Sequence, residues 1–307
     1  GHDKLSFVAR MEWVADNAEM LRAVAEDPYS NTEWWDADSP WEALAGAIEI
    51  TSYADDPHNF VSHLPIHQDA TQSGLQILSL LLRDPEGAAA TNCTPSAEPK
   101  DLYQTVADSV IRQLEDLAKA HNEFAKFWLD FGITRGCVKR PTMTKVYNSS
   151  HHSCFEYTRD WYQTESKKNG KELPVGNTWT PCLFLSRLIW KAMEEILTGA
   201  MKAMEWFKEV AKVCCEHDIP IRWTTPVGFP VKQRYTKWNS EVVKTRIGDK
   251  VRRHNLRVAT DQLDGRKMVN GLSPNFVHSL DSSALVATVN IAEAHGVVDF
   301  AMVHDSF

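Results

Sequence analysis

The centre of the chain carries the segment Thr134-Arg135-Gly136-Cys137-Val138-Lys139-Arg140-Pro141-Thr142-Met143-Thr144-Lys145-Val146-Tyr147-Asn148. If it folds as a helix, Arg135 and Lys139 lie one turn apart on one face, and Tyr147 falls within about 120° of that stripe. Arg offers a fork of donors for phosphate oxygens, Lys a compact charge, and Tyr an aromatic ring with a hydroxyl tip. The segment therefore predicts a face that could grip a triphosphate, although this spacing is more often a solvated surface. Pro141 must kink the helix or lie in its first turn.

Two aspartates far apart in the sequence, Asp69 and Asp305, each follow a segment that predicts a strand. Residues 59–66 alternate enough for a short strand, and residues 297–303 are apolar enough for a buried one. Hard magnesium ions prefer carboxylate oxygens on a rigid scaffold. A lone aspartate at a strand end is more often a turn former or a helix cap. Together the two carboxylates predict a site for two magnesium ions.

Helical periodicity accounts for much of the remaining chain. It predicts helices at about 4–26, 73–83, 101–130, 181–215 and 282–295, and Gly296 ends the last of them. A loop rich in Asp, Trp and Pro follows the first helix. With its few strands, the chain is predicted to be an α+β protein that is mostly helical.

A basic β-hairpin is predicted near the C-terminal third of the chain. Residues 220–235 are rich in β-formers and are broken by Pro226-Val227-Gly228, and residues 250–260 could be the returning strand. The basic residues from 232 to 257 are Lys232, Arg234, Lys237, Lys244, Arg246, Lys250, Arg252, Arg253 and Arg257. Taken alone, such a run is as often a solvated surface as a binding site.

Charge and composition limit the class of protein. The net charge is -8, which argues against a simple nucleic-acid coating protein, and residues 1–60 hold many carboxylates against only Lys4, Arg10 and Arg22. A protein with this net negative charge can still have one basic face. The 6 cysteines form no Cys-x-x-Cys pair, so we expect free thiols. Since the chain has neither an apolar run of roughly 20 residues nor a signal peptide, we expect an intracellular protein without a membrane segment.

A zinc site is an alternative use of the histidines. His58, His63 and His67 precede Asp69, and His151, His152 and Cys154 lie further along. His63 and His67 have the i,i+4 spacing of helical ligands. However, Pro65 stands between them and opposes a helix, which makes zinc the weaker hypothesis.

Three groups of residues together resemble the motifs of single-subunit phage and mitochondrial RNA polymerases. They are the segment from Asp69 to Gln76, the segment from Arg135 to Tyr147, and Asn275-Phe276-Val277-His278-Ser279 with His304-Asp305-Ser306. Their order and approximate separations match that family as well. The similarity extends from about Asp3 to the last residue and includes Trp223 to Pro230.

The resemblance implies a right-hand polymerase with palm and fingers, a small antiparallel palm sheet and a long basic hairpin. It implies palm at residues 1–95, a helical fingers region at 96–220, a promoter-specificity loop at 221–262 and a palm return at 263–307. Family members also carry an N-terminal domain, a thumb and a C-terminal extension, so the chain resembles a fragment that would be inactive in isolation. The implied reaction is attack of the RNA 3′-hydroxyl on the α-phosphate of a nucleoside triphosphate, with pyrophosphate leaving.

The resemblance also implies residue roles. Asp69 and Asp305 would bind two Mg²⁺ ions, and Arg135 and Lys139 would bind the triphosphate. Tyr147 would sense the ribose 2′-hydroxyl. The further implied contacts are Tyr103 and His278 at the nucleotide, and Arg234, Lys237, Arg246, Arg252 and Arg253 at promoter DNA. The implied partners are double-stranded DNA, nascent RNA and nucleoside triphosphates, for a monomer in a host cytoplasm or, alternatively, in a mitochondrion or plastid.

Two positions bear on specificity. Related DNA polymerases carry a bulky Glu five residues after the first catalytic Asp, where it blocks a 2′-hydroxyl; this chain has Gly74, which leaves room for a ribonucleotide. After Tyr147 the family usually has Gly, whereas this chain has Asn148, the residue that best tolerates a left-handed backbone. The alternatives are a non-catalytic nucleic-acid-binding protein and a template-dependent DNA polymerase, and Gly74 argues against the second.

Overall fold

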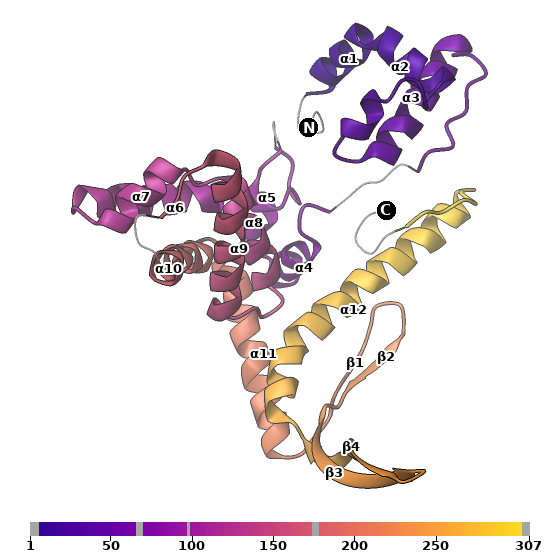
Figure 1. The fold of residues 1–307 in the computed structure, drawn as a ribbon. Helices are drawn as coiled ribbons and strands as arrows, with labels where there is room; N and C mark the ends of the chain where they lie inside the picture. The colour runs from indigo at the N-terminus through magenta and orange to yellow at the C-terminus, as the bar shows by residue number, and fades with distance from the viewer. Residues whose placement is uncertain (1–5, 66–69, 97–98, 174–177, 303–307) are drawn as a thin grey trace. The chain divides into compact units, whose positions relative to one another are not determined.

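The computed structural model describes residues 6–65, 70–96, 99–173 and 178–302. The chain divides into two compact units, Gly1–His67 and Gln68–Phe307. Each unit has its own hydrophobic core. The described residues are mostly helical, with two small antiparallel sheets (Figure 1).

The N-terminal unit is built from short helices. They are α1 (Phe7–Asp16), α2 (Ala18–Glu26), the 3-10 helix η2 (Glu33–Asp36) and α3 (Pro40–Asp55). Their small core consists of Leu21, Val24 and Ala47. The single helix predicted for 4–26 was wrong at Asn17, whose φ of -109° leaves the helical region while its side-chain amide donates to the Trp13 carbonyl at 2.7 Å. That local bond competes with the helical ladder and separates α1 from α2.

The C-terminal unit contains the remaining elements. Its helices are α4 (Ser73–Leu82), α5 (Pro85–Ala90), α6 (Leu102–Lys119), α7 (Glu123–Phe131), α8 (Arg135–Lys145), α9 (His151–Asn169), α10 (Trp179–Ile196), α11 (Thr198–Glu216) and α12 (Gly265–Ala294). Its strands are β1 (Ile221–Thr224), β2 (Pro230–Gln233), β3 (Thr236–Ile247) and β4 (Lys250–Leu263). α6, α8, α9 and α10 pack together, and α4 and α12 pack against α11.

Two predicted helices are each divided in the structure. The helix predicted for 101–130 stops at Lys119, because His121 takes a left-handed φ of 62° and Asn122 starts α7 by accepting a hydrogen bond from the Ala125 amide at 3.0 Å. The helix predicted for 181–215 is divided at Leu197, which ends α10 and precedes α11. The helix predicted for 73–83 is confirmed as α4, and the one for 282–295 is the second half of the longer α12.

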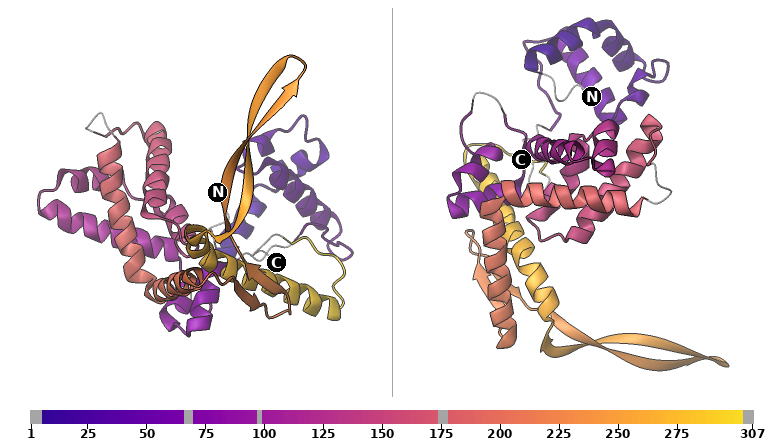
Figure 2. Two further views of the ribbon diagram at one scale, coloured as in Figure 1. Left: turned by 90° about the horizontal axis from the view of Figure 1, so that it is seen from below. Right: turned by 90° about the vertical axis from the view of Figure 1, so that its left-hand side faces the viewer.

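The strand predictions need more correction. β4 pairs antiparallel with β3, so that Lys250 lies opposite Ile247, whereas residues 221–233 form a separate short pair, β1 with β2. The predicted pairing of 220–235 with 250–260 was therefore wrong. The tight Gly248-Asp249 connection brings 236–247 next to 250–263 before the more distant segment can pair. Figure 2 shows β3 and β4 as a long twisted ribbon that joins the first turn of α12.

The two strands expected directly before Asp69 and Asp305 are not found among the described residues. Residues 60–65 and 297–302 have no regular structure and are largely exposed. A strand needs a hydrogen-bonded partner, and in the described ranges neither segment has one. Apolar alternation was thus insufficient evidence for a palm sheet.

Candidate functional site

Helix α8 presents two different faces. Val138, Pro141, Thr142 and Lys145 form a buried stripe, whereas Lys139 is exposed. Pro141 lies inside the helix, at a buried position. The helix ends at Lys145, so Tyr147 belongs to the following turn and not to the helical face that was predicted. Arg135 lies in the first turn of α8, and its side chain is 36% exposed.

Tyr147 packs between α4 and α12. A Cβ added to Gly74 would stand 2.6 Å from the Tyr147 hydroxyl and 2.8 Å from its Cζ, so the ring lies directly on the glycine. On the other side, the Tyr147 and His278 rings are 4.7 Å apart and inclined by 30°. Gly74, Tyr147 and His278, which were all predicted site residues, therefore lie together, although more than seventy positions in the chain separate each residue from the next.

Hydrogen bonds from Gln72, the N-cap of α4, and from Ser273 of α12 hold the last turn of α8 and the residue that follows it. The Gln72 side-chain amide donates to the Thr142 carbonyl at 3.1 Å, and the Ser273 hydroxyl donates to the Val146 carbonyl at 3.3 Å. The side chains of both donors are buried. A buried polar group without a hydrogen bond costs free energy, so these two bonds favour the observed backbone position of the last turn. Asn148 adopts a φ of 64°, which confirms the left-handed backbone expected at this position.

A second cluster surrounds Arg135. Its Nε lies 2.5 Å from Asp101 Oδ2, and its guanidinium stacks 4.8 Å from the centre of the Tyr103 ring. Asp101 also caps α6, accepting from the Tyr103 amide at 3.0 Å and the Gln104 amide at 3.2 Å. An anion approaching Arg135 would have to compete with this carboxylate. The sequence analysis missed Asp101, although its place directly before Leu102, where a helix begins, is a capping signal.

Lys145 is another functional candidate that the sequence analysis missed. It continues the buried stripe of Val138, Pro141 and Thr142, and a charged residue on an apolar stripe is unusual. Its ammonium lies 3.5 Å from Glu194 Oε1 and 3.0 Å from the centre of the Trp190 ring. Burial lowers the pKa of Lys145 to about 8, and the nearby Glu194 opposes that shift only in part.

The two aspartates assigned to metal binding, Asp69 and Asp305, lie outside the described residues. Within the described ranges, no three His, Cys, Asp or Glu side chains group closely enough to hold a metal ion. His67, one of the zinc candidates, also lies outside those ranges. Two carboxylates suit magnesium by their chemistry, since they supply hard oxygen ligands.

The buried thiols do not provide nucleophiles. All 6 cysteines are free, as expected. Burial raises the pKa of Cys154 and of Cys182 to about 12, and it raises the pKa of Cys137 as well. Thiols with such values stay protonated at neutral pH.

The hairpin of β3 and β4 is exposed along nearly its whole length. Among its bases, Lys244 lies directly opposite Arg253, and Thr245 lies opposite Arg252. Like charges on facing positions destabilise an isolated sheet. An anionic partner would relieve this repulsion, so the pairing favours an anion-binding surface over a merely solvated one. Arg234 and Lys237 lie at its base, where they bond to the Asp261 carbonyl and the Gln262 side chain.

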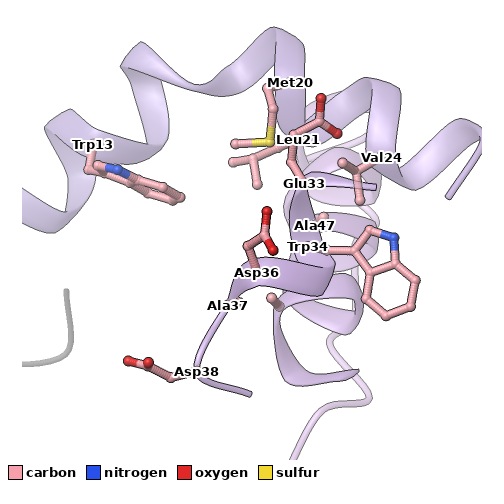
Figure 3. Close-up of a pocket in the computed structure, with 11 residues that line it drawn as sticks. Trp13, Met20, Leu21, Val24, Glu33, Trp34, Asp36, Ala37, Asp38 and Ala47 are labelled. Atoms are coloured by element: carbon pink, nitrogen blue, oxygen red, sulfur yellow. The ribbon is translucent and has the colours of Figure 1, made fainter. Parts of the chain in front are cut away.

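The N-terminal unit contains a pocket of a different character (Figure 3). Its volume is about 350 Å³, and Trp13, Met20 and Leu21 are among its apolar lining residues. Its charged lining residues are the carboxylates of Glu33, Asp36 and Asp38. In Figure 3 the Asp36 carboxylate points toward Met20 and Leu21. Because anionic walls repel phosphate, this pocket does not suit a triphosphate.

No helix in the described part of the chain combines the length and the apolar character needed to cross a membrane.

Comparison with known proteins identifies the family of the chain. The family model for DNA-dependent RNA polymerase matches residues 1–307. The chain is 31% identical to the DNA-directed RNA polymerase of Enterobacteria phage K11, over 100% of the chain and 38% of that polymerase. It is 31% identical to DNA-directed RNA polymerase 1, mitochondrial, of Arabidopsis thaliana, over 100% of the chain and 31% of that protein. It is also 31% identical to T7 RNA polymerase of Escherichia phage T7, over 100% of the chain and 39% of that enzyme.

The chain spans about a third of the length of these relatives. The matches reach phage and plant organelle polymerases at similar identity, and they cover both units of the structure. The chain belongs to the DNA-dependent RNA polymerase family.

Proposed function

We propose that this chain is the palm-and-fingers part of a polymerase that copies DNA into RNA. The observation that carries the proposal is the packing of Tyr147 on Gly74 and His278, because it joins three separate motifs at one place. The membership of the family supports it. The proposed parts are palm at 1–95 and 263–307, fingers at 96–220 and a promoter-binding hairpin within 221–262.

The proposed reaction joins a nucleoside monophosphate unit to the RNA 3′-hydroxyl and releases pyrophosphate. Arg135 would exchange its Asp101 partner for phosphate oxygens, and the exposed Lys139 would add a second positive charge one turn away. Tyr147 would hold the sugar and accept or donate a hydrogen bond at its 2′-hydroxyl, with His278 stacked behind it.

Asp69 and Asp305 are the proposed ligands of two Mg²⁺ ions. Bound there, the ions would favour the ionised form of the attacking 3′-hydroxyl and offset negative charge on the triphosphate. One similar polymerase comes from a bacteriophage and another is named as mitochondrial. The proposed place of action is therefore a host cytoplasm, or alternatively a mitochondrion or plastid. The proposed partners are promoter and template DNA, RNA and nucleoside triphosphates, and the proposed state is a monomer.

The test is nucleotide addition by the protein expressed from its complete gene, on a primed DNA template with magnesium. We expect template-dependent addition of ribonucleotides. Asp69→Asn and Asp305→Asn should each lower the rate by several orders of magnitude and leave DNA binding nearly intact, because the basic hairpin is unchanged. Near-normal addition by either variant would reject the two-metal assignment.

A non-catalytic nucleic-acid-binding role is the second candidate, and the exposed basic hairpin favours it. Binding of the same template without any nucleotide addition by the unmodified protein would select this candidate. Preferential addition of deoxyribonucleotides would select a DNA polymerase instead.

A further inference from the structure

Lys145 makes a partly buried ion pair between two helices of the proposed fingers. Its side chain is only 4% exposed, whereas its partner Glu194 is 53% exposed. The ammonium lies 3.5 Å from the Glu194 carboxylate and 3.0 Å from the centre of the Trp190 ring. Both partners belong to α10, so the contact joins the last residue of α8 to the C-terminal part of a neighbouring helix.

This contact is close to the proposed sugar-binding residue in the chain. Tyr147 follows Lys145 by two residues, and the intervening Val146 carbonyl accepts the Ser273 hydroxyl at 3.3 Å. A cavity of about 430 Å³ adjoins the pair and is also lined by Asn148. The end of α8 therefore contacts α12 on one side and adjoins an open cavity beside the ion pair.

We propose that the Lys145–Glu194 pair is a clamp that fixes the end of α8, and with it Tyr147, and that loss of the Lys145 proton releases this clamp. The clamp regulates the sugar-selecting site, so the inference rests on the proposed function. Lys145 acts as a positioning residue, since it contacts α10 and Tyr147 is the group that meets the nucleotide. Selection of ribose over deoxyribose should then weaken as pH rises.

The surroundings of Lys145 place its titration in an accessible range. Burial lowers its pKa to about 8, with Glu194 opposing the shift. From α9, His151 and Cys154 face the same region. Burial lowers the pKa of His151 below its ordinary value and raises that of Cys154 to about 12, so the pKa of each shifts away from that of Lys145. From α11, the charged groups that line the cavity are Lys202, Glu205 and Lys208.

The protonated and the neutral form of Lys145 differ in how strongly they bind Glu194 and Trp190. The ammonium is attracted both by the Glu194 carboxylate and by the face of the Trp190 ring. A neutral amine retains neither attraction at comparable strength, so the link between α8 and α10 weakens. Tyr147 then keeps its contacts with Gly74 and His278 but loses one of the anchors of the turn that carries it.

The experiment measures kcat/KM for a ribonucleotide and for the matching deoxyribonucleotide from pH 7 to 9, using the protein expressed from its complete gene. Only their ratio is interpreted, because the pH dependence of the chemical step is shared by both nucleotides and cancels. We expect the ratio to fall by roughly fivefold over this range, the lower limit for one lost hydrogen bond. The fall should be centred near pH 8.

Variants separate the clamp from general effects of pH. Lys145→Met removes the charge, so its ratio should be low at pH 7 already and should not change up to pH 9. Lys145→Arg keeps a charge at every pH used and should hold the ratio constant. The control is Lys191→Met, which breaks an exposed pair with Glu195 on the same α10, 3.8 Å long, and should follow the unmodified protein.

The outcomes are distinguishable. A flat ratio in the unmodified protein, or the same pH-dependent fall in Lys145→Met, would overturn the clamp while leaving the proposed polymerase intact. The measurement on the unmodified protein needs no variant, so it tests the clamp even if Lys145→Met fails to fold. Absence of any templated nucleotide addition by the unmodified protein would instead overturn the proposed function.

Discussion

The Tyr147 hydroxyl lies so close to Gly74 that a Cβ on that residue would be 2.6 Å from it. A residue with a Cβ at position 74 would have to displace the Tyr147 side chain. Moving the hydroxyl alone would not be enough, because the ring Cζ would also lie only 2.8 Å from that Cβ. Gly74 therefore has a structural role beside its proposed role of leaving room for a ribose. It provides the surface on which the proposed sugar sensor rests.

Gly74→Ala should destabilise the protein and impair nucleotide addition. Alanine in a helix normally gains about 0.5–1 kcal/mol over glycine, but here the clash with Tyr147 costs about 1–3 kcal/mol. The matched control is Gly46→Ala in α3, where nothing lies within 4 Å of the added Cβ. Urea unfolding should show a lower midpoint for Gly74→Ala and a higher one for Gly46→Ala. An equal gain in both would show that Tyr147 does not rest on Gly74.

Tyr147→Phe should keep most of the ribonucleotide activity and admit deoxyribonucleotides more readily. The ring retains its packing on His278 at 4.7 Å, while the hydroxyl that would bond to the 2′-hydroxyl is lost. Such a bond corresponds to roughly 1–3 kcal/mol, about a factor of 5 to 150 in the ratio of kcat/KM values. Unchanged sugar discrimination in the active variant would leave Tyr147 with a structural role only.

Asp101→Asn should tighten nucleotide binding. The amide keeps the N-cap of α6 but removes the charge that holds Arg135 at 2.5 Å, so a triphosphate meets less competition. Because the pair is partly exposed, the effect on KM should be about two- to fivefold. Asp116→Asn, which breaks the exposed pair with Lys119 on the same helix, serves as the control and should leave KM unchanged. A raised KM in Asp101→Asn would show that the carboxylate positions Arg135 for the nucleotide.

Lys145 should make stability depend on pH above neutrality. Its pKa is about 8 in the folded state and about 10.4 in the unfolded chain, so between these values the unfolded state binds more protons. The free energy of unfolding therefore rises with pH across this window, because relief of the buried ammonium's desolvation outweighs the attraction to Glu194 that is lost. Lys145→Met should lack that rise and should be no less stable at pH 7, since the remaining Glu194 is half exposed. The measurement is urea unfolding at pH 7 and pH 9.5; parallel changes in both proteins would contradict the assignment.

Arg246→Ala and Arg253→Ala should impair initiation at a promoter much more than elongation on a primed template. Both residues lie on the exposed hairpin, and Arg253 faces Lys244 across the strands. Each substitution should also reduce the dependence of log binding constant on log salt by about 0.9. Lys119→Ala, an exposed change on α6, is the control. Equal losses on both templates would place the hairpin away from promoter DNA.

Part of the fold and the site is encoded locally and was predictable from sequence. Apolar spacing predicted α4 and the second half of α12, and Asn148 predicted the left-handed turn after Tyr147. The order of motifs around Asp69, Arg135 and Asp305 predicted the family, because a chain of linked motifs rarely arises by chance. These features depend on residues that are close together in the sequence, or on the residue type at a given position.

Other features depend on residues that meet only after folding. Helical periodicity continues through Asn17, His121 and Leu197, yet the backbone departs from the helix at each, because tertiary packing and capping override a weak local preference. The pairing of β3 with β4 followed the tight turn at Gly248, whereas the pattern of β-formers allowed a more distant partner.

By itself, the sequence determined the family, through the order of its motifs. It also determined which chemical groups the proposed site can use: cations, an aromatic hydroxyl and a glycine. Only the tertiary structure decided how those groups are restrained. It placed Tyr147 on Gly74, tied Arg135 to Asp101 and buried Lys145 between Glu194 and Trp190. The reason is physical: each contact joins residues 34 to 73 positions apart, and its energy depends on distance and burial, which no local pattern specifies.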